Sequence, residues 1–65
     1  MTKSDKNLIE RAELFGDPRA LAATVATIYR CGSSRTQQEI RDYIGRHRSV
    51  WLMLTWVNGC PVPRN

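Results

Sequence analysis

The side chains that could support catalysis or bind a metal are few and scattered in this sequence. The strong metal ligands are two cysteines and one histidine, Cys31, Cys60 and His47. A structural zinc site needs four ligands, usually arranged as close pairs, and no such pair is present. The six carboxylates alternate with lysines and arginines, and there is no glycine-rich phosphate loop. The sequence therefore predicts a protein that is not an enzyme and that holds no metal and no cofactor.

Three arginines, Arg41, Arg46 and Arg48, lie close together in a chain of net charge +4 and pI near 9.7. Arginines can bind the phosphates of nucleic acid without reading its sequence. The neighbouring Glu39 and Asp42 give the segment an alternation of charge that is more typical of a solvated helix face. We therefore expect nucleic-acid contact by these arginines only as an alternative function.

The same segment resembles the helix-turn-helix family of DNA-binding proteins, because residues 38–49 read Gln-Glu-Ile-Arg-Asp-Tyr-Ile-Gly-Arg-His-Arg-Ser. In this comparison the two isoleucines are the inward residues and Gly45 is the turn. Arg41 stands where the family usually has a small residue, and the segment 50–57, in the place of the recognition helix, has only Thr55 to contact base edges. The resemblance implies a DNA-binding transcription regulator, which is the alternative to the function favoured below.

The apolar residues near the C-terminus favour contact with protein. Read as a helix, residues 50–57 are apolar almost all round, and such a helix tends to be buried on every side. A chain of 65 residues cannot cover both sides, so we expect a partner, most simply a second copy in a symmetric homodimer. The other interpretation is that residues 61–63 fold over this patch. The predicted interface residues are Trp51, Leu52, Met53 and Trp56.

The first helix that must support these residues is predicted over residues 5–15. Ser4 or Asp5 is expected to cap it, and Gly16 is expected to end it in the left-handed conformation. The residues expected to share its inward face are Leu8, Ile9, Ala12 and Phe15.

The second helix is the best signalled in the chain. Asp17 is a strong cap, and Pro18 stands at the first helical position, where its missing N–H costs nothing. Apolar residues then follow at helical spacing, and Gly32 closes the helix. We therefore predict a helix over residues 18–31.

The third helix is expected to start at a capping box formed by Thr36 and Glu39. Three interpretations of the region after Gly45 are open. One helix can run through the glycine to residue 57, the glycine can be the turn before a short helix from residue 49, or residues 50–57 can be a strand, which would lack a partner. Unbroken spacing along one face favours a single helix, with its inward face formed by Ile40, Ile44, Trp51 and Leu54.

The sequence also predicts the conformation of the last residues, the cellular compartment and the state of the cysteines. Two prolines two apart make residues 60–65 an extended tail after a domain of residues 1–59. The N-terminus lacks the apolar core of a secretory signal, and no stretch reaches the ~18 apolar residues of a membrane span, so we expect a cytoplasmic protein with no membrane contact. In that compartment, cysteines are expected to remain thiols.

Three runs in this chain are similar to the small accessory proteins encoded in the early exo-xis region of lambda-like bacteriophages and prophages. They are Glu-Arg-Ala-Glu-Leu-Phe-Gly-Asp from residue 10, Leu-Ala-Ala-Thr-Val-Ala-Thr-Ile-Tyr-Arg from residue 21 and Arg-Thr-Gln-Gln-Glu-Ile from residue 35. The resemblance implies a small helical protein, made early in infection, that tilts development towards lysis or disturbs host physiology by contacting a host regulatory protein. It supplies no site residues.

Together these observations predict an all-α protein in which two short helices pack on a longer third helix. Its favoured function is regulation through protein-protein interaction, and its remaining apolar side is expected to be the interface of a homodimer.

Overall fold

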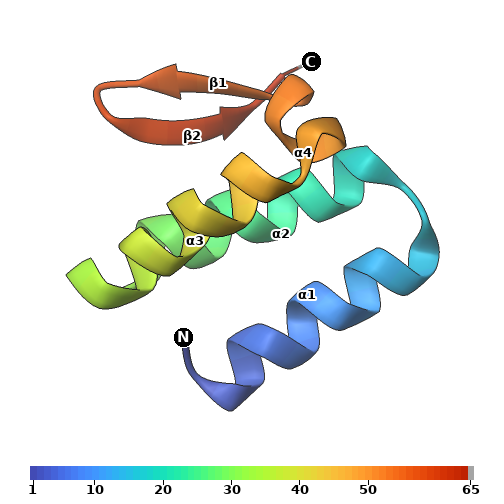
Figure 1. The fold of residues 1–65 in the computed structure, drawn as a ribbon, viewed down its shortest axis with the longest axis horizontal. Coiled ribbons are helices and arrows are strands. Elements are labelled where there is room, and N and C mark those ends of the chain that lie inside the picture. Colours follow the sequence, from blue (N-terminus) through green and yellow to red (C-terminus); the bar gives the residue numbers. More distant parts are fainter. Residues whose placement is uncertain (65) are drawn as a thin grey trace.

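A computed structural model of the chain describes residues 1–64, which form four helices and a two-stranded antiparallel sheet (Figure 1). The structure is mostly helical, but it is not all-α as the sequence predicted, because a hairpin follows the helices. None of the helices in the described residues is long and apolar enough to cross a membrane. In chain order the elements are α1 (Lys3–Phe15), α2 (Pro18–Cys31), α3 (Ser34–Arg46), α4 (Arg48–Leu52), β1 (Leu54–Val57) and β2 (Cys60–Pro63).

Helix α1 begins two residues earlier than predicted because its cap is Thr2, not Ser4 or Asp5. The Thr2 hydroxyl accepts from the Asp5 amide at 3.1 Å, and the Asp5 carboxylate accepts from the Thr2 amide at 3.3 Å. This reciprocal pair is a capping box. The helix ends as expected at Gly16, whose φ of 68° lies in the left-handed region that glycine adopts without steric cost.

The predicted bounds of helix α2 are confirmed. The Asp17 side chain caps the helix by accepting from the Arg19 amide at 3.0 Å, and Pro18 is its first residue. At the other end, the Gly32 amide donates to the Tyr29 carbonyl at 3.3 Å. Both ends are therefore fixed by residues that lie next to them in the chain.

Helix α3 differs from its prediction at both ends. Its cap is Ser33, whose hydroxyl accepts from the Thr36 amide at 3.4 Å, so the predicted capping box of Thr36 and Glu39 is wrong. The helix passes through Gly45 and stops at Arg46, so the single long helix is also wrong.

His47 makes the break between α3 and α4. Its ring stacks on Tyr43 with the ring centroids 4.0 Å apart, and its Nδ1 lies 2.8 Å from the Tyr43 carbonyl oxygen. The His47 amide bonds instead to the carbonyl of Ile44 at 3.2 Å. The ring nitrogen thus occupies the acceptor that the His47 amide would use if the helix continued, and the chain can turn.

The chain after α4 forms a hairpin. Strand β1 pairs with β2 in the register Leu54 with Pro63 and Val57 with Cys60. The two turn residues, Asn58 and Gly59, both have positive φ, 52° and 78°, as a type I′ turn requires. The prediction that a strand here would lack a partner is wrong, because the extended tail is that partner.

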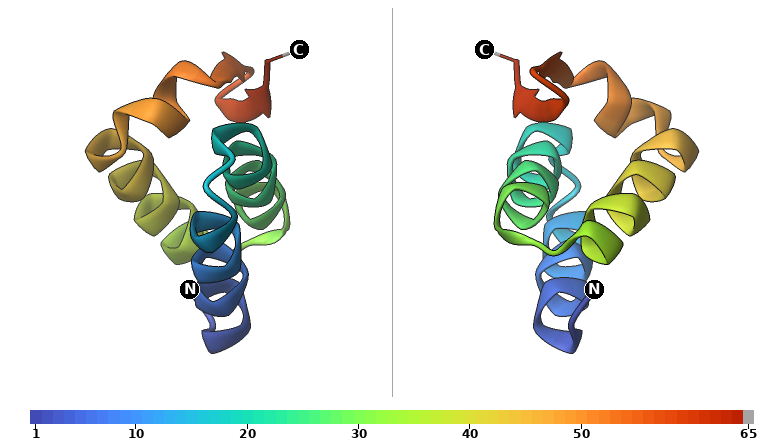
Figure 2. Two further views of the ribbon diagram at one scale, coloured as in Figure 1. Left: turned by 90° about the vertical axis from the view of Figure 1, so that its right-hand side faces the viewer. Right: turned by 90° about the vertical axis from the view of Figure 1, so that its left-hand side faces the viewer.

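The core lies between α2 and the elements around it (Figure 2). Helix α2 contacts α1, α3, α4 and β2, so α2 is the central helix, and the predicted arrangement around a long third helix is wrong. In α1, Ile9 and Ala12 are buried as expected, whereas Leu8 is half exposed and Phe15 is 83% exposed. The buried hydrophobic residues are Ile9, Ala12, Leu21, Ala22, Val25, Ala26, Ile28, Tyr29, Ile40, Ile44, Val50 and Leu54.

The break at His47 decides which residues of the third predicted helix face inward. Ile40, Ile44 and Leu54 are buried as predicted, but Trp51 is 51% exposed. Val50, which helical spacing also places on that face, is buried with no exposed surface. Because the helix restarts after His47 in a new direction, the helical spacing that related Trp51 to Ile44 is lost.

Candidate interaction surface

The four predicted interface residues lie where α4 meets β1, and we call them the corner patch: Trp51, Leu52, Met53 and Trp56. Trp51 and Leu52 are each about half exposed, whereas Met53 and Trp56 are partly buried against the core. The sequence had placed Trp51 inward and Trp56 outward. The structure turns Trp51 outward and Trp56 partly inward, while it keeps their rings close together, with centroids 6.4 Å apart.

Trp56 packs against the core residue Tyr29. The two rings meet edge to face, with centroids 6.0 Å apart and an interplanar angle of 87°. This is a favoured geometry for aromatic pairs. Tyr29, Trp56 and Trp51 therefore form a continuous series of rings that runs from the last turn of α2 to the surface of α4.

The hydroxyl group of Tyr29 joins three elements of the fold. It donates to the Gly59 carbonyl in the hairpin turn at 3.1 Å and accepts from Nη2 of Arg41 in α3 at 2.9 Å. The Arg41 guanidinium carbon also lies 5.6 Å from the centroid of the Tyr29 ring, within the range of a cation-π interaction. Sequence reasoning treated Tyr29 only as an inward residue of α2, because nothing near it in the chain indicates a contact with a turn thirty residues away.

The three arginines predicted for phosphate contact differ in how firmly hydrogen bonds hold their side chains to the fold. Arg41 is held by Tyr29 and also donates to the Gln38 side chain at 3.3 Å. The Arg46 side chain donates to the backbone carbonyl of Asp42 at 3.3 Å, within its own helix. Arg48 lines a shallow hollow beside Trp51. Arg46 and Arg48 are thus available to a ligand, whereas Arg41 is a structural residue.

A second polar contact ties α1 to α3 on the other side of the molecule. The Tyr43 hydroxyl donates to the Glu13 carboxylate at 3.0 Å. Partial burial, and then the hydrogen bond to this carboxylate, raise the pKa of Tyr43 to about 12. Both effects favour the neutral phenol, so this tyrosine is a structural donor and is poorly suited to act as a base near neutral pH.

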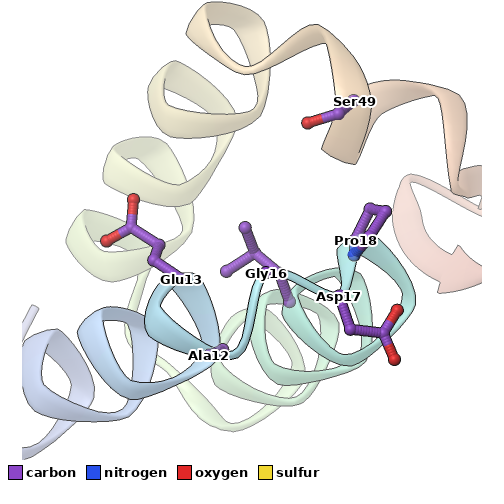
Figure 3. A pocket seen from close by; sticks show the side chains of 7 residues that line it. Ala12, Glu13, Gly16, Asp17, Pro18 and Ser49 are labelled. Carbon is purple, nitrogen blue, oxygen red and sulfur yellow. The ribbon is translucent and has the colours of Figure 1, made fainter.

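A hollow at the corner between α1 and α2 faces the start of α4 (Figure 3). Its carboxylates are Glu13 and Asp17, and the first accepts the Tyr43 hydroxyl while the second caps α2. Ser49 approaches the hollow from α4. Because both carboxylates already serve the fold, this hollow offers little with which to bind a charged ligand.

The residues considered for a metal site are not brought together. Cys31 and Cys60 are exposed thiols, and the ring of His47 is bound to the Tyr43 carbonyl. Across residues 1–64, no group of three histidine, cysteine or acidic side chains is arranged to hold a metal ion.

No protein-family model, curated protein or solved structure matches this chain.

Proposed function

We propose that this protein is a small regulator that acts by binding another protein through the corner patch. The observation that supports this most directly is the half exposure of Trp51 and Leu52, two large apolar side chains next to each other on α4. The resemblance to early exo-xis proteins of lambda-like phages suggests the setting. The partner would be a host regulatory protein in the bacterial cytoplasm, and binding would modulate host physiology or the choice between lysis and lysogeny.

The corner patch has the features of a binding hot spot. Tryptophan is enriched among the residues that dominate interface energies. Burying the exposed part of Trp51 or Leu52 would contribute about 1–3 kcal/mol for each side chain. Trp56 packs against Trp51 and Tyr29, so the patch is held in place before a partner arrives, and little conformational entropy remains to be lost on binding.

The test is capture of a partner from a bacterial lysate, followed by a direct binding measurement with the purified partner. We expect Trp51→Ala and Leu52→Ser to weaken binding about tenfold or more, as loss of a hot-spot residue does. Leu14→Ser is the matched control, because Leu14 is 87% exposed but lies on α1. Equal binding by the corner variants and the Leu14 variant would refute the proposed surface.

Nucleic-acid binding is the second candidate, favoured by the position of Arg48 beside the exposed Trp51. An aromatic ring next to a guanidinium group can stack a base and hold its phosphate. The recognition helix considered over residues 50–57 does not form, since those residues span α4 and β1. Such binding would therefore be independent of base sequence.

Salt distinguishes the two candidates. Binding to phosphates should weaken steeply as salt rises and should fall further when Arg46 and Arg48 are both changed to alanine. Binding to a protein through Trp51 and Leu52 should change little in either case, because it depends on apolar burial. A titration of a fluorescent oligonucleotide at two salt concentrations makes this measurement.

A further inference from the structure

The two edges of the hairpin differ in their backbone groups. Because the turn has two residues, Val57 and Cys60 on either side of it form a hydrogen-bonded pair. Hydrogen-bonded and non-hydrogen-bonded pairs alternate along an antiparallel ladder, so Thr55 and Val62 are also a hydrogen-bonded pair. The Arg64 amide donates to the Met53 carbonyl at 2.8 Å, which continues this alternation. The N–H and C=O groups of the residues between, Leu54 and Trp56, therefore point away from β2.

The outer edge of β2 is closed. Pro61 and Pro63 occupy the positions whose amides would point outward, and proline has no N–H to donate. Strand β2 also lies between β1 and α2 and packs against that helix (Figure 1). A further strand cannot pair at this side of the hairpin.

The outer edge of β1 is open. Within residues 1–64, neither the Leu54 amide nor the Trp56 backbone groups have a backbone partner, and the Leu54 carbonyl accepts only from Nε of Arg64, at 3.2 Å. Proteins usually protect such an edge with charge, proline or a bulge. Here β1 itself holds neither a charge nor a proline, and Val57 on it is half exposed. The charged side chain that reaches this edge is that of Arg64, whose Nε also donates to Thr55 Oγ1 at 3.1 Å.

We propose that β1 pairs antiparallel with β1 of a second copy, which joins the two hairpins into one four-stranded sheet. With the two-fold axis at Thr55, Leu54 of each copy faces Trp56 of the other. All outward amide and carbonyl groups of both strands are then paired, and the Arg64 side chain gives up the Leu54 carbonyl. Moving the axis by one residue would require pairing by Leu52, which is in α4, or by Asn58, which is in the turn.

Side chains also fit this register. On the outer face, Thr55 and the half-exposed Val57 of each copy lie near the axis and are uncharged, whereas Met53 lies before β1 and packs against the core. Thr55 lies opposite itself. β1 itself carries no charge. The nearest cation is Arg64, whose Nε donates to Thr55 Oγ1 at 3.1 Å, so this side chain must turn away from the axis when the two strands pair.

The prolines of β2 explain why the assembly stops at two chains. Once the two β1 strands pair, the free edges of the joined sheet are the two β2 strands, which lack outward N–H groups at Pro61 and Pro63. Growth of the sheet therefore stops at two chains, as in a closed two-fold assembly. This inference goes beyond the proposed function, because it uses the backbone of β1 and leaves Trp51 and Leu52 on α4 for another protein.

Sedimentation equilibrium with charge variants of Thr55 tests the pairing. The unmodified chain should be a dimer, and Thr55→Lys and Thr55→Glu should each weaken dimerisation about tenfold or more, because two like charges would meet at the axis. An equal mixture of the two variants should restore the dimer. Val62→Lys is the matched control, since it adds the same charge to the same face of the hairpin but on β2.

Three results would overturn the proposal. They are a monomer at millimolar concentration, a dimer that Thr55→Lys weakens no more than Val62→Lys does, and a mixture of the two Thr55 variants that stays monomeric. Thr55 is exposed, and circular dichroism on each variant verifies that the chain remains folded.

Oxidative cross-linking gives an independent readout. In a background of Cys31→Ser and Cys60→Ser, Thr55→Cys should form a disulfide between copies rapidly, because a non-hydrogen-bonded pair places the Cα atoms ~4.5 Å apart, within disulfide range. Val62→Cys should cross-link slowly. Equal rates would contradict the pairing. Trp51→Ala should leave both the cross-link and the sedimentation unchanged, so the dimer and the proposed partner binding can fail separately.

Discussion

The helical body, residues 3–46, and the C-terminal unit, residues 48–63, differ in how their charged and apolar residues are distributed. In the body, each helix begins at a side-chain cap, and its charged residues remain outside the core. The C-terminal unit has one charged residue, Arg48, and buries only Val50, Leu54 and Pro61. Both regions expose large apolar side chains, but only in the unit do these lie in a stretch almost without charge. They are Leu8, Leu14 and Phe15 in the body and Trp51, Leu52, Val57 and Val62 in the unit.

This difference separates the scaffold from the interaction surface. A two-stranded hairpin is marginally stable by itself and must pack on something else. Here it rests on α2, and the bond from the Tyr29 hydroxyl to the Gly59 carbonyl holds its turn. The unit therefore depends on the body, shares its core through Val50 and Leu54, and offers Trp51, Leu52 and the edge of β1 to other molecules.

The largest effect is expected in the body. Ile40 has no exposed surface, so Ile40→Ala should lower the free energy of unfolding by about 2–5 kcal/mol, the usual cost of such a cavity. In a domain this small, we expect both regions to unfold together. Urea denaturation followed by circular dichroism and by tryptophan fluorescence measures this. Leu52→Ala, which removes a half-exposed side chain, is the control, and an equal loss in that variant would erase the distinction between the two regions.

A smaller effect is expected at the junction of the two regions. Tyr29→Phe keeps the ring beside Trp56 but removes the hydroxyl that donates to Gly59 and accepts from Arg41. We expect this to lower the free energy of unfolding by about 1–2 kcal/mol. Because the turn is released, Trp56 should become more accessible to a quencher while helical circular dichroism is retained. Tyr43→Phe is the matched control, since it removes a hydroxyl that bonds to α1 instead. Unchanged quenching in the Tyr29 variant would show that the hairpin does not need this bond.

Two glycines should respond to alanine with opposite signs. Gly45 lies inside α3, and a Cβ there would meet nothing within 4 Å, so Gly45→Ala should stabilise the body by about 0.5–1 kcal/mol. Gly59 has φ of 78°, so Gly59→Ala should destabilise the unit by about 1 kcal/mol. Thermal unfolding of both variants checks this. A loss of stability at Gly45 would mean that its helical conformation is not retained.

The last effect appears only at alkaline pH and concerns Tyr43 of the body. The pKa of Tyr43 is about 12 in the folded chain, above the value of ~10 for an unfolded tyrosine, so the folded state holds this proton more tightly. This contribution to stability is complete below pH ~10 and is lost as the pH rises towards 12. Denaturation between pH 8 and 12 should therefore show a smaller alkaline loss in Tyr43→Phe than in the parent chain. Identical curves would contradict the role of the bond to Glu13.

Part of the candidate surface could be predicted from the sequence. The run from Val50 to Trp56 is too apolar for a short chain to bury completely, and composition alone indicates this. Which of its residues stay outside could not be predicted, because the direction of each side chain depends on the break at His47. That break uses a ring contact with Tyr43 that competes with an ordinary helical hydrogen bond, and the spacing of apolar residues does not report it.

The sequence by itself determined the elements whose signals act over a few residues. Asp17, Pro18 and Gly32 fix α2, and Gly16 ends α1, because a cap bonds to amides or carbonyls in its own turn of helix. The hairpin was decided only by tertiary structure. Asn58 and Gly59 suit the end of a helix as well as a type I′ turn, and the choice between them depends on the pairing of two strands and on Tyr29, thirty residues earlier. Such contacts become favourable only when the whole chain has folded, so no local pattern contains them.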